Sequence, residues 1–470
     1  MKSSHIISIL RIFTKKETRE LRKWLSSPMH NQREDVIQLF EYLMMANHLE
    51  EEKFLKKERI FSKIFNNEPY DDAKLRQTIH FFTKAVEGYI VYKEQCEDDI
   101  QTNLALAAFY RKRKLDKLFQ KTIKKVEGNQ EGSPLRDRAF FENEYALYNE
   151  KQLFKSGKKR TVSLNLQKYS DALDLDYLAK KMNQICIILT HQRVFKENCE
   201  IGLLDQVLEY VEEHDFFHSP AISIYYYIYK TLTVPQETKY FKNLKAEIEE
   251  HGPRFTHSEI RDIYLMAINY CIGRMNAGDE DFIKEAFILY REGLEQKVLI
   301  EEGSVSRFTF LNIIGIALKL REFNWVDHFI EEYKQYLEIQ HRESIVNYSR
   351  SRLHFEKKEY AIAMRLLLKV EYDDILLNLV TKSMLLKIYY ELDEIDALDS
   401  LLDSLRTYLN RKEVVGYHKA NYQNIIRFTK KLTRITPYRK DQKKKLKLEI
   451  ERASPLTEKE WLLQQLELLA

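Results

Sequence analysis

Lysine and arginine gather in one segment near the C-terminal end of the sequence, where they could bind an anionic partner. Between Arg411 and Lys447 there are 13 Lys and Arg residues against Glu413 and Asp441, a local balance of +11. The candidate residues of this patch are Lys430, Lys431, Arg434, Arg439, Lys440, Lys443, Lys444, Lys445 and Lys447. Lysine outnumbers arginine among them, which suits non-specific attraction of phosphates better than bidentate recognition of bases. The alternative is a solvated helix face, since the upstream residues 371–404 carry a balance of −7.

Other residue patterns give little support for catalysis or for binding a cofactor. The sequence has neither a GxGxxG nor a GxxxxGK[ST] motif, which excludes a P-loop for nucleotides. His214 and His218 have the i, i+4 spacing of two metal ligands, but no third ligand is identifiable and solvent exposure is the favoured interpretation. Cys186 lies in an apolar run, which favours a buried free thiol. We therefore predict a protein that is not an enzyme and has no cofactor and no metal site.

The scarcity of glycine and proline predicts the elements that must position these residues. Glycine and proline together make up 20 of 470 residues, whereas an average chain carries roughly 12% of the two. Sheets and barrels need many tight turns with positive φ, so they are disfavoured. With 44% hydrophobic residues the chain has enough material for a core. We expect an all-α fold of long helices joined by short loops.

Short motifs predict where several of these helices begin and end. Capping boxes, in which a threonine and a glutamate satisfy each other's backbone amides, occur at residues 14–17 and 457–460. Ser133 and Ser219 each precede a proline, a pair typical of a first helical turn. The glycine-containing residues 128–133 predict a loop.

Weak internal periodicity predicts four consecutive helix–turn–helix units in the C-terminal two-thirds. In the two clearest units, Tyr348–Val370 and Ser383–Leu405, Ala363 and Leu398 take equivalent places 35 residues apart. Val326 lies 37 residues before Ala363, and Ala286 lies 40 residues before Val326. Repeats of this length are typical of stacked helix pairs.

These units resemble tetratricopeptide repeats over roughly residues 260–410. Ser351 and Ala363 are small where the two helices of a unit approach closely, and Leu367 and Val370 follow on the buried face of the second helix. The resemblance implies a right-handed α-solenoid of antiparallel helix pairs with degenerate repeats.

A second resemblance covers nearly the whole chain. The segments Ser27–Asn31, Ile224–Lys230, Ile388–Leu392 and Tyr422–Phe428 are similar to those of a family of large helical-repeat proteins common in Bacteroidetes. This resemblance implies a bacterial cytoplasmic protein and assigns no activity.

The predicted organisation has three parts: an irregular N-terminal helical region over 1–175, helix-pair repeats over 176–410, and capping helices with the basic segment over 411–470. The leading hypothesis is a scaffold that binds a protein or peptide along its concave face. The alternative is a nucleic-acid-associated protein that uses residues 411–447. A net charge of +4, reduced cysteines and the lack of a signal peptide or apolar span favour a cytoplasmic protein without a membrane partner.

Overall fold

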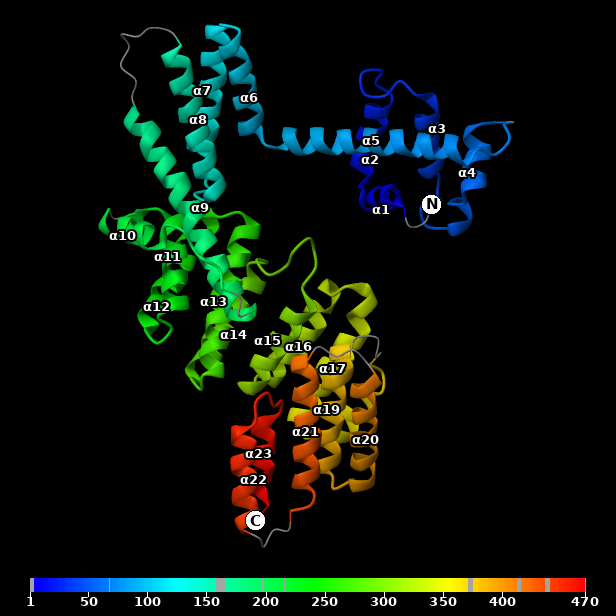
Figure 1. Ribbon diagram of the computed structural model, residues 1–470, viewed down its shortest axis with the longest axis vertical. Coiled ribbons are helices and arrows are strands. Elements are labelled where there is room, and N and C mark those ends of the chain that lie inside the picture. Colours follow the sequence, from blue (N-terminus) through cyan, green and yellow to red (C-terminus); the bar gives the residue numbers. More distant parts are fainter. Residues whose placement is uncertain are drawn as a thin grey trace. The chain divides into compact units, whose positions relative to one another are not determined.

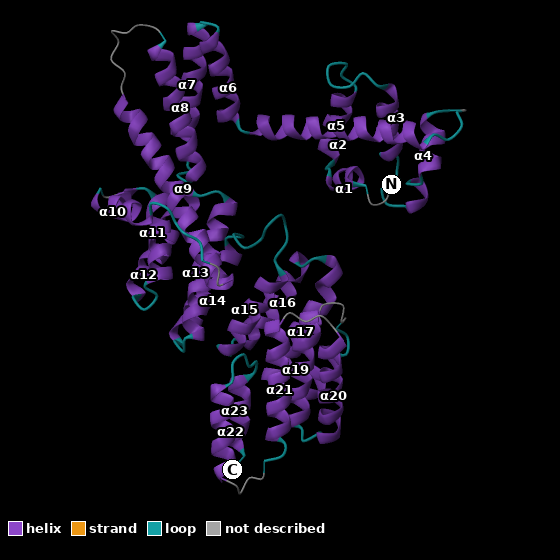
Figure 2. Ribbon diagram, in the orientation of Figure 1, coloured by secondary structure: helices purple, strands orange, loops and turns teal. Residues whose placement is uncertain are grey.

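The computed structural model describes residues 4–66, 68–157, 166–195, 198–214, 216–370, 375–411, 416–435 and 440–469. Over these residues the chain forms 23 α-helices. No strand occurs among them, and Figure 2 shows helices joined by loops. The predicted all-α class is therefore confirmed. The chain divides into two compact units, Met1–Gln184 with Gly202–Ile222 and Ile185–Ile201 with Ser223–Ala470.

The first unit holds the N-terminal helices. They are α1 (His5–Ile12), α2 (Lys15–Leu25), α3 (Glu34–Leu43), α4 (Lys57–Ile64), α5 (Asp72–Glu97), α6 (Asp99–Lys112), α7 (Asp116–Gly132), α8 (Arg138–Ser156) and α10 (Leu204–Glu213), with the 3-10 helices η1 (Glu52–Phe54) and η2 (Phe216–His218). Helices α9 (Leu166–Phe195) and α11 (Pro220–Thr233) each contribute residues to both units.

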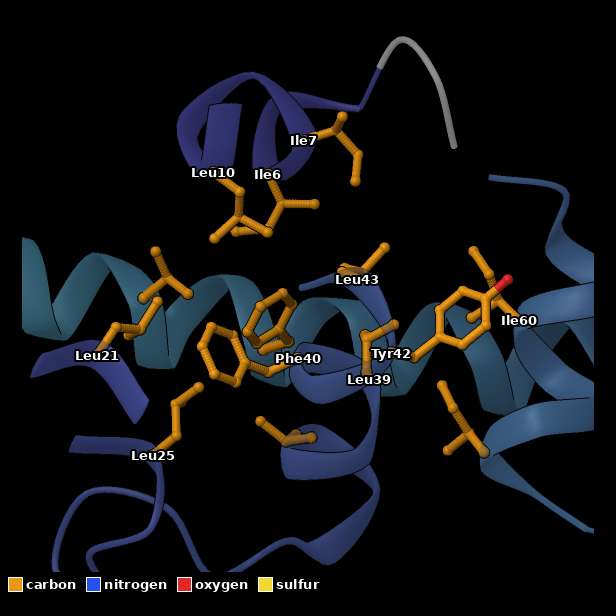
Figure 3. Packing of buried hydrophobic residues seen from close by; sticks show 14 of the residues in the cluster. Ile6, Ile7, Leu10, Leu21, Leu25, Leu39, Phe40, Tyr42, Leu43 and Ile60 are labelled. Atoms are coloured by element: carbon orange, nitrogen blue, oxygen red, sulfur yellow. The ribbon is translucent and has the colours of Figure 1, made fainter. Parts of the chain in front are cut away.

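The core of α1 to α5 forms because α5 carries an apolar stripe at helical spacing. Leu75, Phe82, Val86 and Tyr89 follow one another along one side of α5, and all four are buried. Helices α1 to α4 gather around this helix (Figure 1), and Figure 3 shows Phe40 of α3 among the residues that fill the space between them. The long α5 therefore acts as the support on which four short helices are packed.

The motifs that predict helix starts succeed at two places and fail at two. The capping box of Thr14 and Glu17 begins α2, and Pro220 begins α11. The capping box predicted at 457–460 is wrong, because α23 (Lys459–Leu468) begins after Glu458, whose φ is 55°. The predictions around Ser133 are also wrong. Helix α7 continues through the predicted loop to Gly132, and α8 is capped by Asp137, which accepts a hydrogen bond of 2.9 Å from the Phe140 amide.

The second unit is built from the remaining helices. They are α12 (Thr238–His251), α13 (His257–Asn276), α14 (Asp281–Glu295), α15 (Arg307–Lys319), α16 (Phe323–Tyr333), α17 (Ile339–Glu356), α18 (Tyr360–Leu367), α19 (Ile375–Glu391), α20 (Ile395–Arg411), α21 (Gly416–Leu432), α22 (Lys440–Arg452) and α23, with the 3-10 helices η3 (Gly252–Arg254) and η4 (Lys334–Tyr336). The four predicted helix–turn–helix units are the pairs α13–α14, α15–α16, α17–α18 and α19–α20.

One backbone turn recurs between the two helices of each pair. In each turn one residue has a left-handed backbone conformation, and its amide donates to the carbonyl of the residue three positions earlier. The amide of the following residue donates to the carbonyl of the residue five positions before it. This is the Schellman motif, which satisfies the last carbonyls of a helix. The left-handed residues are Gly278 (φ 94°), Arg321 (φ 59°), Lys358 (φ 60°) and Asp393 (φ 59°). The same turn joins α6 to α7 at Lys114 (φ 57°).

Four of these five positions are not glycine, so each of the four stores conformational strain. Replacing exposed Lys358 by glycine should raise the free energy of unfolding by about 1 kcal/mol, because the left-handed conformation disfavours a Cβ by about that amount. The neighbouring Lys357 is also exposed but has φ −77°, so Lys357→Gly should instead lower stability by about 0.5–1 kcal/mol. Urea unfolding of the two variants checks this; shifts in the same direction would contradict it.

The capping box of α2 should make stability depend on acid pH. The Glu17 carboxylate accepts hydrogen bonds from Lys93 Nζ at 2.6 Å and from the Thr14 amide at 2.7 Å, and these contacts lower the pKa of Glu17 from 4.5 to about 2. A lowered folded-state pKa means that the stabilisation is present above about pH 4.5 and is lost as the pH falls toward 2. We expect the denaturant midpoint of unfolding of Glu17→Gln to change less over this pH window than the midpoint of the unchanged protein does. Equal pH dependence in both proteins would refute this assignment.

Candidate functional site

The face formed by α13, α15 and α17 is hollowed by two cavities. The larger, of about 540 Å³, lies between the first half of α13 and the starts of α15 and α17. The smaller, of about 210 Å³, lies further along, between the C-terminal half of α13, the middle of α15 and Arg352 of α17. Because α13, α15 and α17 are the first helices of successive pairs, the cavities lie on one face of neighbouring repeats.

Helical spacing explains why these side chains share a face. On α13 the cavity residues follow at intervals of four, seven and three, and on α15 they follow at intervals of three, four and four, each close to one turn. The residues concerned are Arg261, Leu265, Ile272 and Met275 on α13, and Phe308, Leu311, Gly315 and Lys319 on α15. Buried Ile316 also lines the smaller cavity, so part of this face belongs to the core.

An apolar ring stays exposed at the larger cavity. Phe308, which lines this cavity, is 57% exposed. The Arg307 guanidinium lies 5.0 Å from the centre of the Phe308 ring. An aromatic ring beside a cation at the mouth of a cavity can contact both an apolar and an acidic group of a ligand.

The charges on this face are mostly positive. Arg261 is committed to Glu301 and Asp262, and the hydrogen bond from Arg261 lowers the pKa of Glu301. Among the described residues no carboxylate forms an ion pair with Lys319 or Arg352. These two side chains therefore give the face a positive potential that favours an acidic ligand.

Gly315 leaves room for the side chain of Arg352. The Arg352 Nη1 donates to the carbonyl of Leu311 at 3.4 Å. A Cβ at position 315 would lie 3.1 Å from Arg352 Nη2, which is tighter than ordinary contact. The missing side chain thus lets the guanidinium lie across α15 at the edge of the smaller cavity.

The chain's own C-terminal helices cover α19, which is the next first helix, and α21, which follows the last pair. Trp461 of α23 is buried, and its indole Nε1 donates to Glu391 of α19 at 2.9 Å. Lys387 forms an ion pair of 2.9 Å with Glu458, and the Asn424 amide of α21 donates to the Pro455 carbonyl at 2.7 Å. Together these contacts fix α23 on α19 and α21 (red beside orange in Figure 1), so the exposed series of first helices ends at α17.

Four of the nine predicted basic residues make contacts within the fold. Lys430 pairs with Asp403 at 2.8 Å, Lys431 with Glu449, and Lys447 with Glu467 at 2.9 Å. Lys443 donates to the Leu469 carbonyl at 2.5 Å. In each ion pair the lysine hydrogen bond lowers the pKa of the carboxyl group. Acidic residues of α20, α22 and α23 therefore offset part of the basic segment's charge.

The other predicted basic residues remain at the surface. Arg434, Lys440, Lys444 and Lys445 are exposed, and the described part of the chain supplies no carboxylate paired with them. Arg439 lies outside the described residues. The remaining patch is thus four described cations: Arg434 just after α21, and Lys440, Lys444 and Lys445 in the first half of α22.

His214 and Cys186, which the sequence offered as candidates for metal binding or nucleophilic chemistry, each contact a backbone carbonyl. His214 is exposed, and its Nδ1 lies 3.1 Å from the Tyr210 carbonyl at the end of α10. The predicted burial of Cys186 is confirmed: its thiol donates to the Tyr225 carbonyl at 3.2 Å, and burial raises its pKa. Within the described ranges, no three His, Cys, Asp or Glu side chains are grouped to hold a metal ion, and no helix is both long and apolar enough to cross a membrane.

Sequence reasoning missed the face of α13, α15 and α17. None of Phe308, Lys319 and Arg352 stands out by type, because single aromatic and basic residues are common on helices. Their common signal is position: each lies away from the buried stripe of a first helix. That signal becomes readable once the helix pairs are aligned by their turns.

Trp461 provides a test of the C-terminal cover. Trp461→Phe keeps an aromatic ring but removes the donor to Glu391, so we expect a loss of about 1.5 kcal/mol in the free energy of unfolding and faster proteolysis of residues 440–469. Trp325→Phe is the matched control, because no described acceptor receives a hydrogen bond from the Trp325 indole. If both variants lose the same stability, the indole hydrogen bond does not hold α23 in place.

Comparison with known proteins found no matching family model, no matching curated protein and no matching solved structure.

Proposed function

We propose that this chain is a non-enzymatic helical-repeat scaffold that binds an acidic peptide segment of another protein on the face of α13, α15 and α17. The observation that carries the proposal is the pair of adjoining cavities on this face, next to exposed Phe308 and the cations Lys319 and Arg352. A ligand with apolar side chains for the cavities and carboxylates for the cations fits this combination.

The finer architecture belongs to the same proposal. We infer a right-handed α-solenoid of degenerate tetratricopeptide-like repeats, of the kind found in large helical-repeat proteins of Bacteroidetes. The recurring turn supports it, since its left-handed residues Arg321, Lys358 and Asp393 are spaced by 37 and 35 residues. Stacked pairs with this period expose their first helices on a common concave side. Four free cysteines suit a cytoplasmic setting.

Selection from a random peptide library on the full chain tests this function. Enriched peptides should combine Asp or Glu with Phe or Leu. Their affinity should fall about tenfold in Lys319→Glu and in Phe308→Ala, which corresponds to ~1.4 kcal/mol for each change. Lys284→Glu is the matched control, because Lys284 is an exposed lysine on the second helix α14 and does not line either cavity.

The alternative function is association with nucleic acid through residues 411–447. The observation in its favour is that Arg434, Lys440, Lys444 and Lys445 are exposed and unpaired among the described residues. A DNA or RNA duplex should then bind with an affinity that decreases steeply with salt, and charge reversal at Lys440, Lys444 and Lys445 should abolish it. If the selected peptides bind the variant with reversed charges at Lys440, Lys444 and Lys445 as tightly as the original chain, but bind Lys319→Glu weakly, the peptide-binding face is favoured over the alternative.

A further inference from the structure

The α6–α7 hairpin of the first unit has an outer face that is both apolar and basic. The inner sides of the two helices pack with α8 through Leu104, Ala107, Phe119, Ile123, Val126 and Leu147. On the hairpin, four large apolar side chains stay exposed: Leu106 (41%), Phe109 (45%), Leu115 (42%) and Leu118 (44%). Such a concentration of exposed apolar groups is typical of an interaction surface.

Helix geometry places the main apolar residues on one side. On α6, Leu106 and Phe109 point away from buried Leu104, because residues two and five positions apart face opposite sides of a helix. On α7, Leu118 lies two turns before Lys125, so both occupy the same edge. Lys125 reaches Asn103 of α6 at 3.4 Å, which shows that this edge borders α6. Leu118 therefore lies along the seam between the two helices, next to the outer side of α6.

Unpaired cations surround this apolar seam. Lys112, Arg113, Lys114, Lys117, Lys121 and Lys124 are exposed, and among the described residues no carboxylate is paired with any of them. Asp116 at the start of α7 is the one acid within residues 111–125. The acids Glu150 and Glu127 are committed to Arg111 and Lys151 at 2.8 and 2.6 Å. The Arg113 guanidinium lies 3.8 Å from the centre of the Phe109 ring, so charge and apolar surface are in direct contact.

We propose that this outer face binds an acidic amphipathic helix of another protein. The apolar stripe of such a helix would cover Leu106, Phe109 and Leu118, and its flanking carboxylates would meet the lysines on both sides. Because α6 has 14 residues, a partner helix of about 14 residues matches its length of ~21 Å. A second copy of the same face is disfavoured, since it would bring like charges together. A nucleic-acid duplex would engage the lysines but leave the leucines in water. The surface lies in the first unit and is independent of the proposed peptide-binding face on α13, α15 and α17.

A model peptide tests this surface on the full chain. The probe is a fluorescent helix of about 18 residues with leucine at heptad positions a and d and glutamate elsewhere, compared with a scrambled peptide of the same composition. In anisotropy titrations we expect the patterned peptide to bind at least about tenfold more tightly than the scrambled one. Added salt should weaken its binding, because exposed charge pairs are screened.

Matched variants separate the contributions of charge and apolar contact. Lys117→Glu with Lys121→Glu should reduce affinity for the patterned peptide about tenfold, whereas Lys23→Glu with Lys84→Glu, exposed lysines of α2 and α5, should not change it. Leu106→Ser with Leu118→Ser should have a similar effect, and Leu153→Ser on α8, which is 37% exposed, should have none. Circular dichroism confirms that each variant keeps its helices.

Three outcomes would overturn the proposal. The first is equal binding of the patterned and scrambled peptides. The second is unchanged binding in the leucine variants. The third is that a DNA duplex or phosphatidylserine vesicles bind through Lys117 and Lys121 while the patterned peptide does not, which would assign the surface to a different class of partner.

Discussion

The left-handed residue that ends the first helix of each pair is the constraint on which the second unit depends. Its two backbone hydrogen bonds satisfy the last carbonyls of that helix and reverse the chain, so the next helix returns alongside it. Because this reversal is local, it recurs at Arg321, Lys358 and Asp393 although the surrounding sequences differ. The two helices of each pair then pack against each other and against the neighbouring pairs. One side of the first helix is not covered by these contacts.

This uncovered side of the first helices is closed in one part of the second unit and open in another. On α19 and α21 it is closed by α23, with Trp461 bonded to Glu391 and Leu462 fully buried. On α13, α15 and α17 the two cavities remain. The C-terminal helices thus mark where a ligand face on these repeats would end.

The fold was largely predictable because its signals are local. The capping box of Thr14 and Glu17 places a helix start within one turn, and the periodicity around Ala363 and Leu398 locates two helix pairs. The same kind of signal fails at Ser133, where the buried faces of α7 and Asp137 outweigh a serine–proline pair and two helical glycines. Local preference amounts to about 1 kcal/mol per residue, so packing of a whole helix face can override it.

By itself the sequence determined the all-α class, the helix pairs and the identity of the basic segment, because composition and period act within a few turns. Only the tertiary structure decided which cations have partners. Lys430 meets Asp403 and Lys431 meets Glu449 across different helices, and neither pairing can be read from spacing. The cavities beside Phe308 are equally non-local, since three first helices must be brought together to form them. Charge neutralisation and concavity depend on distances between helices, which one-dimensional periodicity does not contain.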